Sequence, residues 1–430
     1  MTAHMTAPIV NANNPGVGPT MNGAPSPKLG SAYWRLWTAS TISNLGDGMF
    51  LVALPLLAAR TTSSPFEVSL VTAFSMLPWL LVSLHAGAIV DRSDKRKLLI
   101  TGDVFRGIVI LTLTIVVAMD AVQMWMLWSL ALCLGVAEVV FDNAAQAILP
   151  AIVEPELLEK ANGRRYSAEL TANIFLGTPL GGALFALAIW LPFGVDAVSY
   201  LAAAILVIPL RGTFKTARCA TFPKTTLSQE VREGFRWLWG SKILRGMALA
   251  LACTNLGLGM TPGLFILYVQ DELHVSERWY GAMLGVMALG GITAGLVGER
   301  IIARLGKIGT LYAMAVGWVA VMATIGLVPQ IAVVLVAETL GVFAVTLWNI
   351  GTVSLRQQLV PAAVFGRVNS VYRWFAWGAM PVGAALGGVI AQNSNQRYPY
   401  LAAAACVVVG IGVMSRTVTL ATLREAGGRN

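Results

Sequence analysis

The chain has 430 residues, of which 56% are hydrophobic and only 12% are charged, and its formal net charge is +9. Soluble domains carry about 25% charged residues, so this composition excludes a protein whose surface faces water throughout. A basic balance indicates nucleic-acid binding in a soluble protein, whereas in a membrane protein it indicates cytoplasmic loops rich in Lys and Arg.

Long apolar segments follow a polar N-terminal tail. Residues 1–32 lack a basic segment followed by an apolar run, which predicts a disordered cytoplasmic tail and not a signal peptide. A spanning helix needs about 20 mostly apolar residues. The segments that meet this requirement are 35–59, 67–90, 98–119, 124–147, 164–190, 194–210, 243–270, 279–303, 308–328, 331–353, 368–392 and 398–415. Twelve membrane-spanning helices are therefore expected.

Basic residues fall in alternate loops. With the N-terminus in the cytoplasm, the outer loops contain only Arg60, Arg278 and Arg397. The inner loops contain nearly all the others, among them Arg92, Lys95, Arg96, Lys97, Lys160, Arg164, Arg165, Arg304 and Lys307. This bias predicts a multi-pass protein of the cell membrane with both termini cytoplasmic, and it argues against a nucleic-acid partner.

The chain divides into two halves of six predicted helices, 33–211 and 243–415. A cytoplasmic linker, 212–242, joins them, and a tail, 416–430, follows. The linker contains an amphipathic stretch from Leu227 to Trp239, which either lies along the inner leaflet or simply connects the halves.

The two halves repeat one another in sequence. Asn44 to Met49 in the first helix matches Asn255 to Met260 in the seventh, and Pro179-Leu180-Gly181 matches Pro381-Val382-Gly383. Such a parallel repeat predicts a binding site near the midplane between the halves.

The loop between the second and third helices contains a specific motif. Gly87 is followed by the pair Asp91-Arg92 and then by Lys95, Arg96 and Lys97. This pattern resembles the cytoplasmic loop signature of the major facilitator superfamily, with Asp94 where that family usually has Gly. Asp91 lies at a helix end and suits a gating latch, because it can pair with Arg or Lys, or cap a neighbouring helix N-terminus, in one conformation and release it in another. The alternative is that the basic residues merely anchor the loop.

Further segments are similar to one branch of that superfamily. Residues 43–48, the pair Asp103 and Arg106, and residues 147–150 resemble the enterobactin-exporter and macrolide-efflux group of transmembrane secretion effectors. The helix-five motif of facilitator antiporters is similar to the segment containing Gly177, Pro179, Gly181 and Gly182, with Thr178 where Gly is usual. The resemblance implies an all-α membrane protein with two pseudo-symmetric halves that exports its substrate and is not an enzyme.

Asp47 is the leading candidate for coupling. An acid near the middle of a spanning helix costs about 2.5–3.5 kcal/mol on insertion scales. Its repeat mate is Leu258, so the fold does not require an acid there. We interpret Asp47 as a proton-coupling or cation-binding carboxylate facing the cavity; the alternative is a tie to a neighbouring helix.

Other acids lie in the helices as well. Glu138 and Asp142 are one turn apart and share a helix face. Asp142 is expected to pair with Arg106 or the basic loop and to belong to the latch, whereas Glu138 is a second coupling candidate. Glu338 is a candidate for an outer vestibule, and Glu169 is expected to pair with Arg164 or Arg165.

Neutral polar and aromatic residues complete the predicted cavity. They are Asn44, Asn255, Trp348, Asn349 and Trp374, each of which could instead serve packing. His85 and His274 are isolated, so neither a metal nor another cofactor is expected. The chain lacks the ATP-binding pattern GxxxxGK[ST], which favours a proton gradient as the energy source.

These features predict a secondary transporter that acts as a monomer in the lipid bilayer. It would export amphipathic small molecules, drugs or siderophore-like compounds, by proton antiport and alternating access. The alternatives are an importer or uniporter of a small solute on the same fold, and a lipid flippase.

Overall fold

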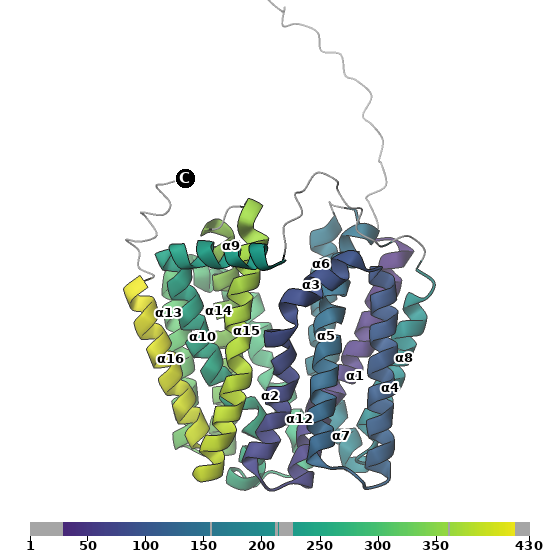
Figure 1. The fold of residues 1–430 in the computed structure, drawn as a ribbon. Helices are drawn as coiled ribbons and strands as arrows, with labels where there is room; N and C mark the ends of the chain where they lie inside the picture. Colours follow the sequence, from purple (N-terminus) through teal and green to yellow (C-terminus); the bar gives the residue numbers. More distant parts are fainter. Residues whose placement is uncertain (1–28, 155–156, 211–213, 215–226, 360–361, 418–430) are drawn as a thin grey trace, which may run out of the picture.

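A computed structural model of the chain describes residues 29–154, 157–210, 214, 227–359 and 362–417. Within these residues the structure is helical and no strand occurs. Long helices run side by side from one end of the bundle to the other (Figure 1). Nine of the described helices are long and apolar enough to cross a membrane, and two shorter apolar helices accompany them.

The helices form two groups in chain order. The first group comprises α1 (Ser31–Thr61), α2 (Pro65–Leu81), α3 (Ser83–Arg92), α4 (Lys95–Ala118), α5 (Met124–Ile152), α6 (Leu158–Glu169), η2 (Leu170–Gly177), α7 (Thr178–Leu187) and α8 (Leu191–Val207). Helix α9 (Leu227–Gly240) lies between the groups. The second group comprises α10 (Lys242–Met260), η3 (Pro262–Leu264), α11 (Phe265–Leu267), η4 (Tyr268–Glu272), α12 (Glu277–Met287), α13 (Leu289–Leu327), α14 (Ile331–Leu359), α15 (Ala362–Asn393) and α16 (Tyr398–Thr417).

Each of the twelve predicted segments coincides with one of these helices or with a run of consecutive ones. The fifth segment is built from α6, the π-helix η2 and α7, because the hydrogen-bond register changes inside it. The eighth and ninth segments share α13, which bends at Gly306, where φ is 70°. Glycine adopts this left-handed conformation without a steric penalty, so it allows a sharp turn between two spans.

Asp94 explains the departure from the facilitator loop motif. It is the N-cap of α4, and its carboxylate accepts hydrogen bonds from the backbone N–H groups of Arg96 and Lys97, at 3.0 and 3.4 Å. An aspartate at this position satisfies backbone donors that glycine would leave open.

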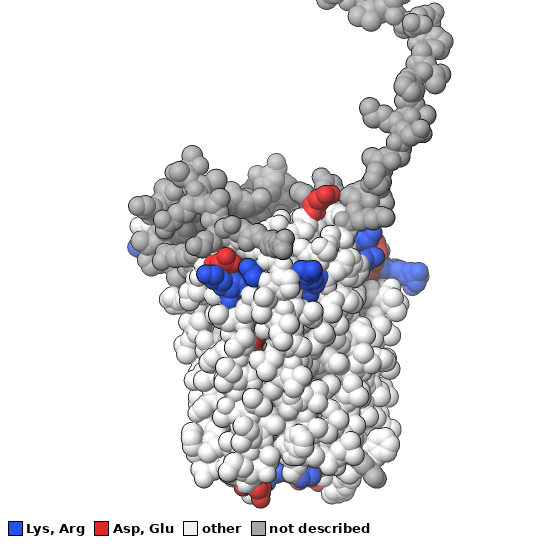
Figure 2. Space-filling view, turned by 90° about the vertical axis from the view of Figure 1, so that its right-hand side faces the viewer, with Lys and Arg blue, Asp and Glu red and all other residues white. Residues whose placement is uncertain are grey.

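Helix α9 lies across the bundle at one end, which we call the α9 end (Figure 1). The aromatic rings of Phe235 and Trp239 lie against the ring of Phe375 of α15, with centroids 6.2 and 6.1 Å from it. The amphipathic stretch is therefore a helix that packs on the second group. Figure 2 shows charged residues gathered at the two ends of the bundle, with a largely uncharged band between them.

The two groups are related by equivalent close contacts. A Cβ atom at Gly46 would collide with Ser199 of α8, and one at Gly257 would lie 2.8 Å from the carbonyl oxygen of Ala403 in α16. The first and seventh predicted spans thus approach the sixth and twelfth in the same manner. This equivalence gives the internal repeat a structural basis.

The groups also touch each other at the end opposite α9. Arg60 of α1 forms an ion pair with Glu277 of α12 at 2.6 Å, and Ser64 donates a hydrogen bond to Gln392 of α15 at 2.9 Å. The Arg60 and Glu277 side chains are 44% and 27% exposed. These contacts hold the two groups together at this end.

Replacing Arg60 with alanine should have a small effect, because exposed ion pairs contribute about 0.2–1 kcal/mol. We expect faster hydrogen–deuterium exchange at the ends of α1 and α12, and less than about a fivefold change in transport rate. The exchanged pair Arg60→Glu with Glu277→Arg should restore wild-type exchange. Unchanged exchange in Arg60→Ala would show that the ion pair does not hold this end closed.

Candidate functional site

A cavity of about 700 Å³ lies between the two groups of helices. This volume is typical of sites for drug-sized molecules. Both groups line it, and most of its wall is apolar or aromatic. The charged side chains among the described lining residues are Asp47, Arg106, Glu138, Glu169 and Glu338. The cavity wall therefore holds four carboxylates and one guanidinium.

Arg106 of α4 is the centre of a charge cluster in the first group. Its guanidinium donates to Asp103 at 2.7 Å and to Glu138 of α5 at 2.6 Å. It also lies over the rings of Phe141 and Tyr200, 4.0 and 4.5 Å from their centroids. Arg106 and Asp103 are each only 1% exposed, whereas the Glu138 side chain is 40% exposed. The cluster is thus buried on one side and open to the cavity through Glu138.

Asp47 joins this cluster through Tyr200 of α8. The Tyr200 hydroxyl donates a hydrogen bond to the Asp47 carboxylate, and both residues line the cavity. Because Tyr200 also lies against Arg106, it links Asp47 to the ion pairs on α4 and α5. Leu258, the repeat mate of Asp47, lines the same cavity from the second group. At this matched pair of positions the first group therefore has an acid and the second group has a leucine.

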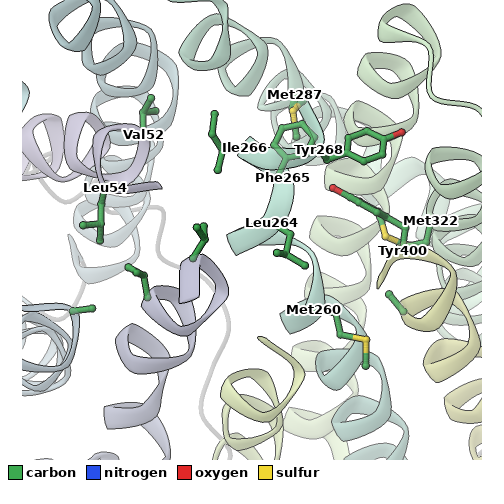
Figure 3. Close-up of a cluster of buried hydrophobic side chains, with 14 of the residues drawn as sticks. Val52, Leu54, Met260, Leu264, Phe265, Ile266, Tyr268, Met287, Met322 and Tyr400 are labelled. Atoms are coloured by element: carbon green, nitrogen blue, oxygen red, sulfur yellow. The ribbon is translucent and has the colours of Figure 1, made fainter. Parts of the chain in front are cut away.

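The second group contributes a different wall. Glu338 of α14 lines the cavity together with Trp318, Met322 and Tyr400. Within the described residues Glu338 has no hydrogen bond or ion pair, and the buried hydroxyl of Tyr400 has no hydrogen-bond partner. Figure 3 shows Tyr400, Tyr268 and Met322 close together on this side. This wall thus offers a single carboxylate among large apolar side chains.

Not all predicted cavity residues lie in the cavity. Asn44, Asp47, Glu138 and Glu338 belong to its lining, whereas the lining contains none of the other predicted cavity residues, Asn255, Trp348, Asn349 and Trp374.

These four residues occupy other places. Trp348 is buried in the main hydrophobic core, and Asn349 is exposed further along α14. Trp374 of α15 donates its indole N–H to the carbonyl oxygen of Leu80 in α2, at 2.9 Å, so it serves contact between the groups. Asn255 is partly buried on α10.

The acids near the predicted latch make different contacts from those that the sequence predicts. Arg106 pairs with Glu138, and the described contacts include no ion pair with Asp142, which is one turn closer to the α9 end. Among the described contacts Asp142 has no ion pair, and neither has Glu169, which lines the cavity and is not paired with Arg164 or Arg165.

The loop motif is only partly described. Lys95 is buried at the start of α4, and the Arg96 guanidinium donates to the carbonyl oxygen of Ile208. Gly87, Asp91 and Arg92 belong to α3, but the surroundings of Gly87 and the side chains of Asp91 and Arg92 lie outside the described part of the structure. The latch remains a prediction.

The helix-five motif lies where the two groups meet. Gly181 packs on α1, where an added Cβ would lie 2.7 Å from the Cα atom of Met49. On the other face, Thr178 and Gly182 approach Gly281 of α12, and Pro179 lies against Gly285. Gly177 likewise packs against Gly48 of α1. The small residues of this motif thus allow three helices to approach closely.

Tyr200 and Asp196, both on α8, are two functional candidates that the sequence motifs do not include. Asp196 is fully buried beside Ser199, and one of its carboxylate oxygens lacks a hydrogen-bond partner in the described structure. An acid inside the apolar sixth span is the signal that could have identified it, by the argument applied to Asp47. Tyr200 is one turn further along the same helix face.

Comparison with known proteins identifies the family. Residues 23–426 match the transmembrane secretion effector family. The multidrug efflux pump Tap of Mycolicibacterium fortuitum is 26% identical over 414 residues, which cover 93% of this chain and 97% of that relative. Macrolide efflux protein A of Streptococcus pyogenes is 23% identical over 394 residues, covering 87% and 93%.

A solved structure with the same fold is that of a bacterial homologue of the iron transporter ferroportin in its inward-facing state. It matches with a TM-score of 0.69 at 18% identity, covering 90% of this chain and 98% of that one. Such transporters have twelve helices in two halves, which agrees with the two groups described above. The chain therefore belongs to the transmembrane secretion effector family of the major facilitator superfamily, and it is a multi-pass membrane efflux transporter and not an enzyme.

Proposed function

We propose that the protein exports amphipathic small molecules in exchange for protons, through alternating access to the central cavity. The observation that carries this proposal is the one-sided arrangement of Asp47, Tyr200, Arg106 and Glu138 in the cavity wall. Acids inside spanning helices are costly and commonly mark proton relays and ion pathways. Here Asp47 accepts a hydrogen bond from Tyr200 and Glu138 pairs with Arg106, and each of these contacts changes when a proton binds the acid.

Glu138 and Asp47 differ in how a proton would act on them. A proton on Glu138 removes its charge and weakens its ion pair with Arg106. Asp103 is then the remaining ion-pair partner of Arg106 among the described residues. A proton on Asp47 removes the charge that accepts the Tyr200 hydrogen bond. Either event changes contacts between helices of the first group, so protonation can favour one conformation over the other.

The chemistry of the cavity favours amphipathic, basic substrates. Its apolar wall suits hydrophobic surfaces, and among its described lining residues four carboxylates stand against one guanidinium. Glu338 is placed to attract a cationic group from the wall opposite the cluster. Two relatives carry the names multidrug efflux pump and macrolide efflux protein, which supports a drug-like substrate class.

The charge bias of the loops supports a cytoplasmic location for the α9 end. In that orientation, the contacts of Arg60, Ser64 and Gly281 close the outer end of the bundle. The described conformation then corresponds to one that takes up substrate from the cytoplasmic side. Export would follow when these contacts between the two groups at the outer end break and the α9 end closes.

Inside-out vesicles with an imposed pH gradient, acidic inside, test this proposal. Gradient-driven uptake of a lipophilic cationic dye should fall to the level of empty vesicles in Asp47→Asn, because the amide cannot carry a proton. Exchange of preloaded dye without a gradient should persist, since the cavity wall is otherwise intact. The matched control is Asp120→Asn, an exposed loop position, which should behave like wild type.

Equal gradient-driven uptake by wild type and Asp47→Asn would exclude coupling through Asp47. Uptake by wild type that ignores the gradient would instead refute proton antiport as a whole. Accumulation of the dye by intact cells that express the protein would indicate import.

A further inference from the structure

A second cleft, of about 640 Å³, lies at the α9 end of the first half. It is formed by the start of α1 on one side and by α6 and η2 on the other. It shares no lining residue with the central cavity. The polar and aromatic residues that line it include Trp34, Trp37, Lys160, Arg164, Ser167 and Thr171.

Two basic side chains at this cleft have no acidic partner among the described residues. Lys160 and Arg164 are one turn apart on α6, and both are exposed. Neither side chain has an ion pair or hydrogen bond within the described structure. Glu169, the expected partner of Arg164, faces the central cavity instead. Two positive charges on neighbouring turns are therefore available to one anionic ligand.

Tryptophans fix the shape of the cleft. The Trp37 indole N–H donates a hydrogen bond to the carbonyl oxygen of Arg164 at 3.3 Å, which ties α1 to α6. The Arg164 guanidinium lies over the ring of Trp34, 5.4 Å from its centroid. Tryptophan is enriched where a membrane protein crosses from the hydrocarbon core to the headgroups. The cleft thus has the composition of a membrane interface.

An apolar stripe continues from the cleft toward the opposite end. Leu176 belongs to the cleft, and Leu180 and Leu187 of α7 follow it on the same helix face, all three exposed. In a spanning helix, exposed leucines on one face contact lipid chains. The cleft therefore lies at the α9 end of a lipid-facing surface, and its charged part lies at the level of the lipid headgroups.

We propose that this cleft binds one anionic phospholipid of the leaflet at the α9 end. The lipid phosphate would lie between Lys160 and Arg164, and an acyl chain would follow Leu176 and Leu180. The charge complementarity and the apolar stripe together favour a lipid over a free phosphate, because only a lipid satisfies both parts of the cleft. Basic residues at the membrane surface attract anionic lipids, each contributing severalfold in affinity.

Native mass spectrometry of protein released from bilayers of phosphatidylglycerol and phosphatidylcholine tests this site. Wild type should retain a phosphatidylglycerol molecule, and Lys160→Ala with Arg164→Ala should lower the retained fraction roughly tenfold. The matched control is Arg232→Ala with Arg236→Ala. These two arginines are exposed and lie one turn apart on α9, so the control also removes two charges. It should retain the lipid as wild type does. An excess of inorganic phosphate should not displace the lipid.

A photoreactive residue at Thr171, an exposed position in the cleft, gives a second measurement that does not depend on removing charge. It should crosslink phosphatidylglycerol in preference to phosphatidylcholine, and the same residue at exposed Thr112 of α4 should show no preference. Equal retention by all variants, equal loss in both charge variants, or displacement by phosphate would each overturn the proposal. So would crosslinking at Thr171 without lipid preference.

Discussion

Replacing Arg106 with methionine is expected to abolish transport and to lower the free energy of unfolding by about 3–5 kcal/mol. Arg106 is buried and forms ion pairs with Asp103 and Glu138. Methionine fills a similar volume but leaves Asp103, itself almost wholly buried, without a countercharge. Removing one partner of a buried pair costs far more than removing an exposed one, because the remaining charge stays desolvated.

A double variant separates the structural effect from the functional one. Arg106→Met with Asp103→Asn removes both charges, and replacing both partners of a buried pair is often close to neutral for stability. Thermal unfolding in detergent should therefore recover toward wild type in the double variant. Transport should not recover, since Glu138 and Tyr200 still lack the guanidinium that joins them.

Arg60→Ala serves as the control, because it removes an arginine from an exposed ion pair at the end of the bundle. Its melting temperature should remain close to that of wild type. If Arg106→Met transported normally, the charge cluster would have no part in the transport cycle. If the double variant regained transport together with stability, Arg106 would have a structural role only.

The sequence was a good guide to the helices and to the repeat, because both depend on local pattern. Runs of apolar residues gave twelve spans that the helices reproduce, and the match between Asn44 and Asn255 marked two equivalent helices. Asp47 was also identified as a cavity residue, since an acid opposite Leu258 stands out within the repeat.

Contacts between helices were harder to predict, because they depend on rotation and depth that one sequence does not reveal. Asp142 and Glu138 share a helix face, and only the structure shows that Arg106 reaches Glu138. Tyr200 carries no charge and therefore gave no signal, although it connects Asp47 to Arg106. The residue type of Trp374 predicts a place in the cavity wall, but its indole N–H contacts α2 instead.

The glycine of α12 that faces the helix-five motif is the basis of the second large effect. A Cβ atom at Gly281 would lie 3.1 Å from the carbonyl carbon of Thr178 and 3.2 Å from the amide nitrogen of Gly182, and closer still to the Thr178 oxygen. All three are backbone atoms, so no rotamer change relieves the collision. The two halves can meet at this seam only if residue 281 has no side chain.

Gly281→Leu is therefore expected to reduce transport to the background of empty vesicles while the protein still folds. Within each half the packing is untouched, so the variant should stay helical and monodisperse in detergent. The clash should open the seam, and hydrogen–deuterium exchange should rise in α7 and α12 but not in α4. Gly281→Ala adds the same colliding atom and should impair transport nearly as strongly, which separates a backbone clash from side-chain bulk.

The matched control is Gly295→Leu on α13, where an added Cβ meets no atom within 4 Å. It makes the same substitution on an exposed helix face and should transport like wild type. Normal transport by Gly281→Leu would mean that the seam between Thr178 and Gly281 never closes during the cycle. Loss of transport with unchanged exchange in α7 and α12 would place the defect elsewhere. Loss of transport together with faster exchange at the seam would show that closure of this end is an obligatory step.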